Sequence, residues 1–435
     1  MTTVAEVRLW GSRIGAVSLE DGADAAVFAY EPGFIGSGVQ PAPIMMPLGP
    51  GVFSFPDLPR RSFHGLPGLL ADALPDKYGN ILIDAWLATQ GRAPESFNAV
   101  ERLCYTGRRG MGALEFAPMA GPRRRVSSKI DIDALVGLAS QVLTHRHDLR
   151  ASFADADKAD ALRDILSVGT SAGGARAKAV IAWNPRTNEV RSGQVEAGEG
   201  FGYWLLKFDG VSGNKDKELA DPKGYGVVEH AYGRMAAAAG ITVAESRLFE
   251  EGGRRHFMTR RFDRLEGGGK LHMQSLAAIA HLDFNNPLAN SYEQALFTMR
   301  RMGLSMAELE EQFRRMVFNV LARNQDDHVK NIAFLMDRSG AWRLSPAFDI
   351  TWSYNPAGEW TSRHQMSING KRDGFSFADL EACAKTVSIN RGHVGRIFDE
   401  VREAVARWPS FADEVGGAES WRDQIGATLR LGLSR

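Results

Sequence analysis

The stretch "NQDDHVKN", residues 324–331, is the most informative short segment of this chain. Asp326 and Asn331 are five residues apart, which is the D-x-x-x-x-N spacing of a kinase catalytic loop. In that loop the aspartate accepts the proton of the substrate hydroxyl and the asparagine binds magnesium. Asp326 is therefore a candidate catalytic base and Asn331 a candidate magnesium ligand. Because this spacing is common by chance, the surrounding sequence has to decide whether it has meaning.

The residues that follow strengthen the pattern, because they predict a hairpin that leads to another carboxylate. IAFLM, the turn DRSG and AWRLS make up this hairpin, residues 332–345. Pairing across the turn brings Asn331 level with about Pro346, and Asp349 in "SPAFDIT" follows closely. Magnesium in proteins prefers such oxygen ligands, so Asp349 is a second candidate ligand. The alternative is that Asp326 and Asp327 only end a helix loop and that Asp349 only begins a turn, as aspartates often do.

His328 lies beside two carboxylates, where it could shuttle a proton or serve as a buried orienting hydrogen-bond partner. The helix predicted over 305–323 delivers this loop, and Ser305 with Glu308 forms its capping box. Its apolar stripe at helical spacing consists of Leu309, Phe313, Met316, Val317, Val320 and Leu321. From about residue 272 onward the pattern is helical.

A kinase also needs a cation for the phosphates of ATP, and Lys207 in "GYWLLKFDG" is the candidate. A lysine on an apolar strand is costly to bury without an anion, unless it reaches solvent at the strand end. Glu229, in the helix predicted over 226–240, could orient Lys207, although exposed helix glutamates are common. Gln274 is a candidate contact for the adenine. Phe262 could pack against the base or belong to the core.

The glycine-rich stretch "SAGGARAK", residues 171–178, is the candidate phosphate loop. It is a poor Walker loop, because Ala175 and Arg176 stand where lysine and a hydroxyl residue belong and because a strand follows. A P-loop NTPase is therefore disfavoured, and a glycine loop between strands is the kinase arrangement. The candidate ATP-binding residues around it are Ser171, Gly173, Gly174, Ala175, Arg176, Lys178, His328 and Lys330.

Composition narrows the class of protein. The chain has 435 residues, 44% of them hydrophobic, which suggests a folded protein with two or three domains. Lysine plus arginine and aspartate plus glutamate number 52 each, so the whole molecule is no obvious nucleic-acid binder. Two distant cysteines, Cys104 and Cys383, argue against disulfides or a cysteine-built zinc site. No signal peptide or membrane segment is recognisable, so we expect a cytoplasmic protein and no membrane partner.

The order of the predicted elements gives the domains. VAEVRLW, IGAVSLE and AAVFAYE read as an antiparallel sheet, and helical spacing over 68–90, despite Pro75, predicts one or two short helices that cover it. We expect an α+β fold: a bilobal, protein-kinase-like pair of lobes preceded by a small β-rich module. The predicted boundaries are a module at 1–120, a strand-rich lobe with the phosphate loop at 121–266 and a helical lobe at 267–435.

Taken together, these segments resemble the HipA family, the serine/threonine-kinase toxins of bacterial HipBA toxin–antitoxin systems. The resemblance covers nearly the whole chain. Besides SAGGARAK, NQDDHVKN and SPAFDIT, it rests on "FHGLPGLLADALPDKYGN", "GRRGMGALEF", "LLKF", "RRFDR" and "SINGK".

The resemblance implies the role of each site residue. Asp326 would be the base, Asn331 and Asp349 the magnesium ligands, and Lys207 the ligand of the ATP phosphates. Ser171 matches the serine that such kinases autophosphorylate in trans. Its phosphate is expected to expel the loop and inactivate the enzyme, because a dianion beside the ATP phosphates is repelled.

The resemblance also implies partners. Family members phosphorylate an aminoacyl-tRNA synthetase, typically the glutamyl enzyme, which arrests translation and growth and produces drug tolerance. They bind a small helix-turn-helix antitoxin, HipB, which recognises operator DNA, so nucleoid association and DNA contact are expected mainly through that partner.

Two positions depart from the family pattern, and two other functions remain open. Arg260 replaces a glutamate that contacts the adenine side in some relatives, and Arg176 with Ala177 replaces the commoner Gln-Glu or Gln-Pro. A small-molecule or lipid kinase shares the logic of the aspartate and asparagine motif, but the N-terminal module argues against it. A non-catalytic co-repressor subunit would not need Asp326, Asn331 and Asp349.

Overall fold

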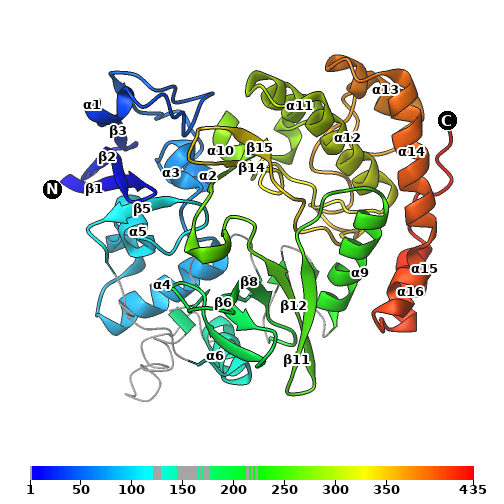
Figure 1. Cartoon of the computed structure of the whole chain (residues 1–435), viewed down its shortest axis with the longest axis horizontal. Helices are drawn as coiled ribbons and strands as arrows, with labels where there is room; N and C mark the ends of the chain where they lie inside the picture. The colour runs from blue at the N-terminus through cyan, green and yellow to red at the C-terminus, as the bar shows by residue number, and fades with distance from the viewer. Residues whose placement is uncertain are drawn as a thin grey trace.

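The computed structural model of this chain consists of three regions, each with its own hydrophobic core (Figure 1). The N-terminal sheet and the C-terminal helices lie at opposite sides of the molecule, and a second sheet lies between and below them in this view. The structure describes residues 2–120, 129–144, 165–166, 168–169, 176–211, 215–216, 219–220 and 224–435.

The N-terminal sheet has five strands in the order β4-β3-β2-β1-β5, all antiparallel. The strands are β1 (Thr2–Leu9), β2 (Ser12–Glu20), β3 (Val27–Tyr30), β4 (Val52–Phe53) and β5 (Leu114–Ala117). In β1, Ala5, Val7 and Leu9 are buried and the residues between them are not, because successive side chains of a strand point to opposite faces. The predicted antiparallel sheet is confirmed.

Short helices cover the buried face of this sheet. They are α2 (Arg60–Phe63), α3 (Gly68–Ala71) and α5 (Ala99–Thr106). Leu69 and Leu70 of α3 and Leu103 of α5 belong to the same core as the sheet. An asparagine and a glutamate, Asn98 and Glu101, form the capping box that begins α5.

Helix α4 (Lys77–Thr89) packs elsewhere. Its buried residues Tyr78, Leu82 and Leu87 belong to the core of the second sheet. The expectation that all of 68–90 covers the first sheet is therefore wrong for α4. Pro75 cannot continue a helix, so α3 and α4 are separate helices, and α4 begins anew at its N-cap Asp76.

The second sheet also has five strands, in the antiparallel order β11-β12-β8-β6-β7. Its members are β6 (Lys178–Asn184), β7 (Glu189–Ser192), β8 (Gly202–Lys207), β11 (Ser246–Glu251) and β12 (Arg254–Arg260). Trp204 and Leu206 of β8 pack with α4 and α6 (Ile132–Thr144) in the second core. Alternation along β8 puts Lys207 on the opposite face, which is the face of Leu205.

Helix α9 (Tyr225–Ala238) joins this sheet to the helical lobe. It lies against β11 and β12 and also against α14 (Arg391–Ala406) and α15 (Trp408–Glu414). Its Val228, Tyr232 and Met235 belong to the core of the helical lobe. The predicted end of this helix is confirmed, because Gly240 follows with a φ of +80°, which glycine adopts without strain.

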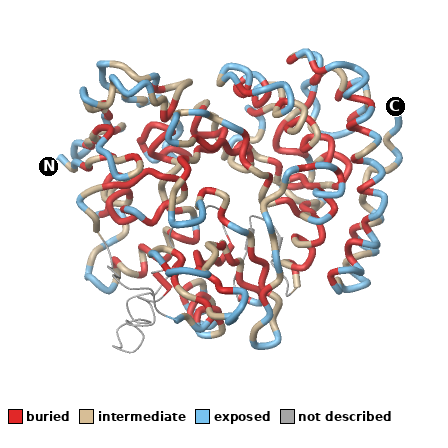
Figure 2. The backbone as a smooth tube through the Cα atoms, viewed as in Figure 1, coloured by how far each residue is buried: buried red, intermediate tan, exposed pale blue. Residues whose placement is uncertain are grey.

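The helical lobe occupies the C-terminal third of the chain. Its other helices are α10 (Leu276–Ala280), α11 (Tyr292–Arg301), α12 (Met306–Leu321), α13 (Phe377–Thr386) and α16 (Glu419–Gly426). The predicted capping box at Ser305 is confirmed, and Ser291 forms another at the start of α11. Buried residues concentrate inside each region and where the regions meet (Figure 2).

A three-stranded sheet lies beside these helices, with the order β13-β14-β15. The strands are β13 (His272–Ser275), β14 (Ala333–Met336) and β15 (Trp342–Leu344). The hairpin of β14 and β15 is the one predicted. The expectation of helix from 272 is wrong at β13, because pairing with β14, distant in sequence, overrides the local pattern.

The remaining short elements are α1 (Pro32–Ile35), β9 (Lys215–Asp216), β10 (Leu219–Ala220) and the 3₁₀ turns η1 (Pro94–Ser96), η2 (Glu266–Gly268) and η3 (Pro287–Ala289). Within the described ranges, every helix is too short or too polar to cross a membrane.

Candidate active site

The end of α12 fixes the position of the loop that carries Asp326. Arg323 leaves the helix with a φ of +56°, and Asn324 then pairs with Ser353 in an isolated parallel bridge. The Gln325 N–H donates to the Ser353 carbonyl at 3.2 Å. The loop is therefore attached to the segment that follows Asp349 as well as to its own helix.

Asp326 lies at the opening of this loop with its side chain about one-fifth exposed, at 19%. The Gln365 amide donates to its Oδ1, and the His328 Nε2 lies 3.9 Å from its Oδ2. The Asn331 Nδ2 donates to the Asp326 backbone carbonyl at 3.0 Å. This last bond uses the amide nitrogen of Asn331, so its amide oxygen is the atom left to bind a cation.

Asp327, the second aspartate of the motif, is buried and anchors the loop. Its carboxylate accepts hydrogen bonds from the Tyr292 hydroxyl at 2.7 Å and the Gln365 N–H at 2.8 Å. The His364 Nδ1 lies 2.7 Å from the same carboxylate, and the other ring nitrogen faces Arg430 at 3.3 Å. These contacts hold the Asp327 carboxylate, and with it the loop, in a fixed position.

Sequence reasoning missed this anchor. Asp327 was visible only as a neighbour of Asp326, and His364 and Gln365 were given no role. Gln365 contacts both aspartates, one through its side chain and one through its backbone N–H. The local signal was limited to a histidine and a glutamine shortly before the "SINGK" segment, and neither belongs to a periodic pattern that would reveal a contact 37 or 38 residues away.

The hairpin brings Asn331 and Asp349 to the same end, as predicted. Phe334 pairs with Leu344, and continuing that register brings Asn331 level with Ala347. Asp349 has a φ of +53°, a strained backbone conformation that is enriched at functional sites. Asn331 and Asp349 line one cavity of about 30 Å³, together with Asp327 and His328.

Lys207 is held between two carboxylates. Its Nζ lies 2.6 Å from Glu229 Oε1 and 2.5 Å from Asp349 Oδ1. The strand therefore supplies the cation, α9 supplies one anion, and the segment after the hairpin supplies the other. The predicted contact of Lys207 with Glu229 is present.

The charges of this trio support one another. Burial opposes the charge of Lys207, but Asp349 and Glu229 outweigh burial and raise its pKa above the ordinary value. Burial alone would raise the pKa of Asp349, but Lys207 holds it below its usual range. Burial raises the pKa of Glu229, and Lys207 and Arg176 counteract that effect.

Arg176 extends this network toward the glycine loop. Its guanidinium lies 4.2 Å above the ring of Tyr225 and its Nη1 lies 4.0 Å from Glu229 Oε2. The Tyr225 hydroxyl in turn donates to the Trp352 carbonyl. The loop residues Ser171, Gly173, Gly174 and Ala175 lie outside the described residues.

The two other candidate cations have contacts of their own. Lys178 is buried and pairs with Asp76, the N-cap of α4, at 3.0 Å, and its charge also helps to lower the pKa of Asp349. Burial raises the pKa of Asp76, although Lys178 opposes this. Lys330 lies over the ring of Phe284 at 4.6 Å. The structure thus gives both lysines structural partners beside the site.

The two residues predicted near the adenine lie in different surroundings. Phe262 packs against Phe348, the neighbour of Asp349, with ring centroids 5.6 Å apart. Gln274 on β13 is fully buried, and neither its amide nitrogen nor its amide oxygen has a hydrogen-bond partner among the described residues. Arg260 points instead to surface carboxylates, Glu245 at 3.3 Å and Glu266 at 3.7 Å.

The oxygen atoms of Asn331 and Asp349 suit a magnesium ion. Magnesium usually takes one or two protein oxygens and completes its shell with water and phosphate oxygens. No cluster of three or more histidines, cysteines or carboxylates suited to an all-protein metal site occurs in the described part of the chain. Two oxygen ligands beside a lysine are a suitable protein contribution to a metal–nucleotide complex.

A five-stranded lobe with a Lys207–Glu229 pair, joined to a helical lobe with Asp326, Asn331 and Asp349, defines a protein-kinase-like bilobal protein. Residues 170–408 match the HipA-like C-terminal domain, and residues 5–117 match the HipA N-terminal domain. The chain belongs to the HipA family.

One solved structure and one curated relative agree with this assignment. The HipA chain of a Shewanella oneidensis complex of HipA, HipB and operator DNA is 18% identical, with a TM-score of 0.65 over 97% of this chain and 94% of that one. A Haemophilus influenzae protein described as a candidate kinase is 28% identical over 135 residues, which span 28% of this chain and 39% of that protein. The Helicobacter pylori proinflammatory kinase CtkA is 12% identical over 59% of this chain and 86% of its own, with a TM-score of 0.38, too low to indicate a shared fold.

Proposed function

We propose that this protein is an ATP- and magnesium-dependent serine/threonine kinase that acts as the toxin of a toxin–antitoxin pair. The observation that carries the proposal is the position of Lys207, whose Nζ lies within 2.6 Å of Glu229 and 2.5 Å of Asp349. A strand lysine paired with a helix glutamate beside a metal-binding aspartate is the arrangement that positions ATP for phosphoryl transfer.

Each residue of the cluster then has a role. Asp326 accepts the proton of the attacking hydroxyl through Oδ2, because its Oδ1 is already bound by Gln365. Asn331 and Asp349 would hold magnesium, which would supply positive charge to the phosphates. Lys207 remains oriented by Glu229 while it binds the phosphates. Phosphoryl transfer needs positioning and charge stabilisation more than covalent chemistry, and these side chains supply both.

The remaining candidates line the nucleotide. We propose that Gln274 and Phe262 contact the adenine side. Gln274 has two polar atoms with no hydrogen-bond partner among the described residues, and Phe262 packs against Phe348, the residue before Asp349. His328 and Lys330 flank the phosphates from the catalytic loop. From the resemblance we assign Ser171, Gly173, Gly174, Ala175 and Arg176 to the phosphate loop, and Lys178, at the start of β6, to its C-terminal end.

Autophosphorylation of Ser171 would inactivate the enzyme. A phosphoserine carries about −2 charge at neutral pH and would be repelled by the phosphates of ATP. This part of the proposal rests on the match of SAGGARAK to the family's phosphate loop.

The partners follow from the family. The Shewanella oneidensis relative was solved with HipB and operator DNA, which supports a helix-turn-helix antitoxin as partner of this chain and DNA contact mainly through it. The equal numbers of acidic and basic residues, 52 each, agree with DNA contact that is made mainly by the antitoxin. We propose an aminoacyl-tRNA synthetase, most simply the glutamyl enzyme, as substrate in the cytoplasm, with nucleoid association when the antitoxin is bound.

The test is transfer of label from γ-labelled ATP with magnesium, to the protein itself and to a panel of purified synthetases. Asp326→Asn should abolish transfer, whereas Asp337→Asn, a matched change at the exposed turn of the neighbouring hairpin, should not. Ser171→Ala should abolish self-labelling but retain transfer to the synthetase. Absence of label on every protein would reject the protein-kinase function, and label on an aminoglycoside or an inositol lipid would replace it with a different kinase class.

A further inference from the structure

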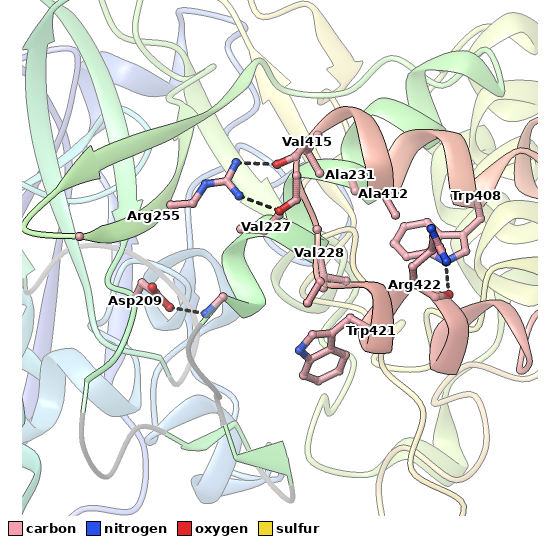
Figure 3. A pocket seen from close by; sticks show the side chains of 15 residues that line it. Asp209, Val227, Val228, Ala231, Arg255, Trp408, Ala412, Val415, Trp421 and Arg422 are labelled. Carbon is pink, nitrogen blue, oxygen red and sulfur yellow. Dashed lines mark hydrogen bonds between the residues drawn. The ribbon is translucent and has the colours of Figure 1, made fainter.

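A second cavity lies beside α9. It has a volume of about 220 Å³. An apolar cavity of about 150 Å³ is large enough for a benzene ring, so this one accommodates a fused pair of rings. Figure 3 shows α9 on one side of it and helices α15 and α16 on the other, with Asp209 and Arg255 approaching from the second sheet.

The wall of this cavity is mostly apolar and aromatic. The apolar side chains are Val227, Val228, Ala231, Trp408, Ala412, Val415 and Trp421. Gly224 and Gly253 open the wall further, because a Cβ atom added at either position would meet no atom within 4 Å. Flat apolar surfaces and open backbone favour a planar aromatic ligand.

The charged groups of the wall favour a cationic ligand over an anionic one. Arg255 donates to the Val415 carbonyl at 2.5 Å and the Gly416 carbonyl at 3.0 Å, at the end of α15. Arg422 is paired with three carboxylates, Asp413, Glu419 and Asp423. Both arginines are thus already engaged.

Asp209 differs from the two arginines. Its Oδ1 accepts the Gly224 N–H at 2.7 Å, and its other carboxylate oxygen has no hydrogen bond to the described residues. Because Asp209 lines the cavity, this oxygen is available to an ammonium group. The faces of Trp408 and Trp421 also attract a cation.

The cavity contacts the candidate active site through two routes. Val228 precedes Glu229, so a ligand against Val228 touches the helix that orients Lys207. The ring of Trp421 lies 6.1 Å from Tyr225, which stacks with Arg176, and 6.2 Å from Trp352, close after Asp349. A ligand in this cavity therefore contacts α9 directly and lies against Trp421, which packs near Tyr225 and Trp352.

We propose that this cavity is a regulatory site for a small planar aromatic amine, whose binding holds α9 in the position that pairs Glu229 with Lys207. The regulatory effect rests on the proposed kinase function, but the binding site does not. Binding and regulation can therefore be tested separately.

Isothermal titration calorimetry with tryptamine, indole and indole-3-acetate tests the binding site. The three compounds share the indole ring and differ in the charge of the side chain. We expect tryptamine to bind most tightly and indole-3-acetate most weakly. Asp209→Asn keeps the acceptor for Gly224 but removes the charge, so it should weaken tryptamine by about tenfold and leave indole unchanged. Ala412→Leu fills the cavity and should abolish binding of all three.

If Ala412→Leu does not fold, the comparison of wild type with Asp209→Asn still tests the site. Absence of heat with all three probes, or the same tryptamine affinity in wild type and Asp209→Asn, would overturn the site. A non-hydrolysable ATP analogue with magnesium should raise tryptamine affinity by roughly fivefold, because coupling between sites is reciprocal. If the analogue binds and tryptamine affinity is unchanged, the regulatory effect is refuted; if the analogue itself does not bind, the kinase proposal fails instead.

Discussion

Replacing Glu229 by glutamine should make the enzyme depend on higher magnesium concentrations. In the structure Lys207 is shared between Glu229 and Asp349, and the predicted magnesium site needs Asp349 to be released. With Glu229 in place, Lys207 keeps a carboxylate partner when it leaves Asp349. In Glu229→Gln only a neutral amide oxygen remains, so Lys207 stays with Asp349 and competes with the metal.

The size of the effect follows from the two kinds of hydrogen bond. A bond to a charged partner contributes about 1.5–3 kcal/mol and a neutral one about 0.5–1.5 kcal/mol. The difference, roughly 1–1.5 kcal/mol, corresponds to about a tenfold change in an equilibrium constant. We therefore expect the magnesium concentration for half-maximal transfer to rise by about tenfold at fixed ATP.

The assay is transfer of label from γ-labelled ATP over a magnesium titration. Glu245→Gln is a matched control, because Glu245 pairs with Arg247 and Arg260 at the surface, away from Lys207. Its magnesium curve should be that of the wild type. A Glu229→Gln curve that also coincides with the wild type would refute the idea that Lys207 and magnesium compete for Asp349.

Three further predictions concern other contacts. Gln365→Ala should lower the rate of transfer by roughly tenfold or more, because Asp326 loses a charged hydrogen bond; a wild-type rate would contradict this. Asp263 is buried between Arg261 and Arg264 and accepts the Gly112 N–H at 2.7 Å. Asp263→Asn should therefore reduce the free energy of unfolding by about 3–5 kcal/mol in denaturant titrations. A loss below about 1 kcal/mol would show that the arginines find other partners. Burial lowers the pKa of His272 to about 4, so the unfolded chain takes up the proton first and stability falls as pH drops from about 6.5 toward 4. His272→Gln should remove about 2 kcal/mol of the stability lost between pH 7 and pH 5, and an unchanged loss would mean that other groups carry it.

Local signals in the sequence were enough for the elements that carry the site. The capping box at Ser305, the hairpin after Asn331 and the alternation around Lys207 each depend on neighbouring residues, and each is present in the structure. The D-x-x-x-x-N spacing also located the loop, because both residues lie within one turn-forming segment.

The rest depends on contacts between distant segments. Nothing near Asp327 indicates that His364 and Gln365 will hydrogen bond to it, and nothing in residues 272–275 indicates that β14 will pair with them. The partner of α4 could not be predicted either, since an apolar helix face fits any apolar surface of suitable shape. Contacts of this kind are determined by tertiary packing, and the local propensity of a segment predicts them only weakly.

The position of α4 has a consequence for how proteins of this kind can be recombined. Tyr78 and Leu82 contribute to the core of the second sheet, and Asp76 neutralises Lys178 at the start of β6. A chimera joined near residue 120, which would exchange the N-terminal module with that of a relative, would replace one half of a packed interface and one partner of a buried ion pair. After α4 the chain returns to the first sheet through α5 and β5, so no single crossover point separates the two cores. The N-terminal module and the second sheet would therefore have to be exchanged together.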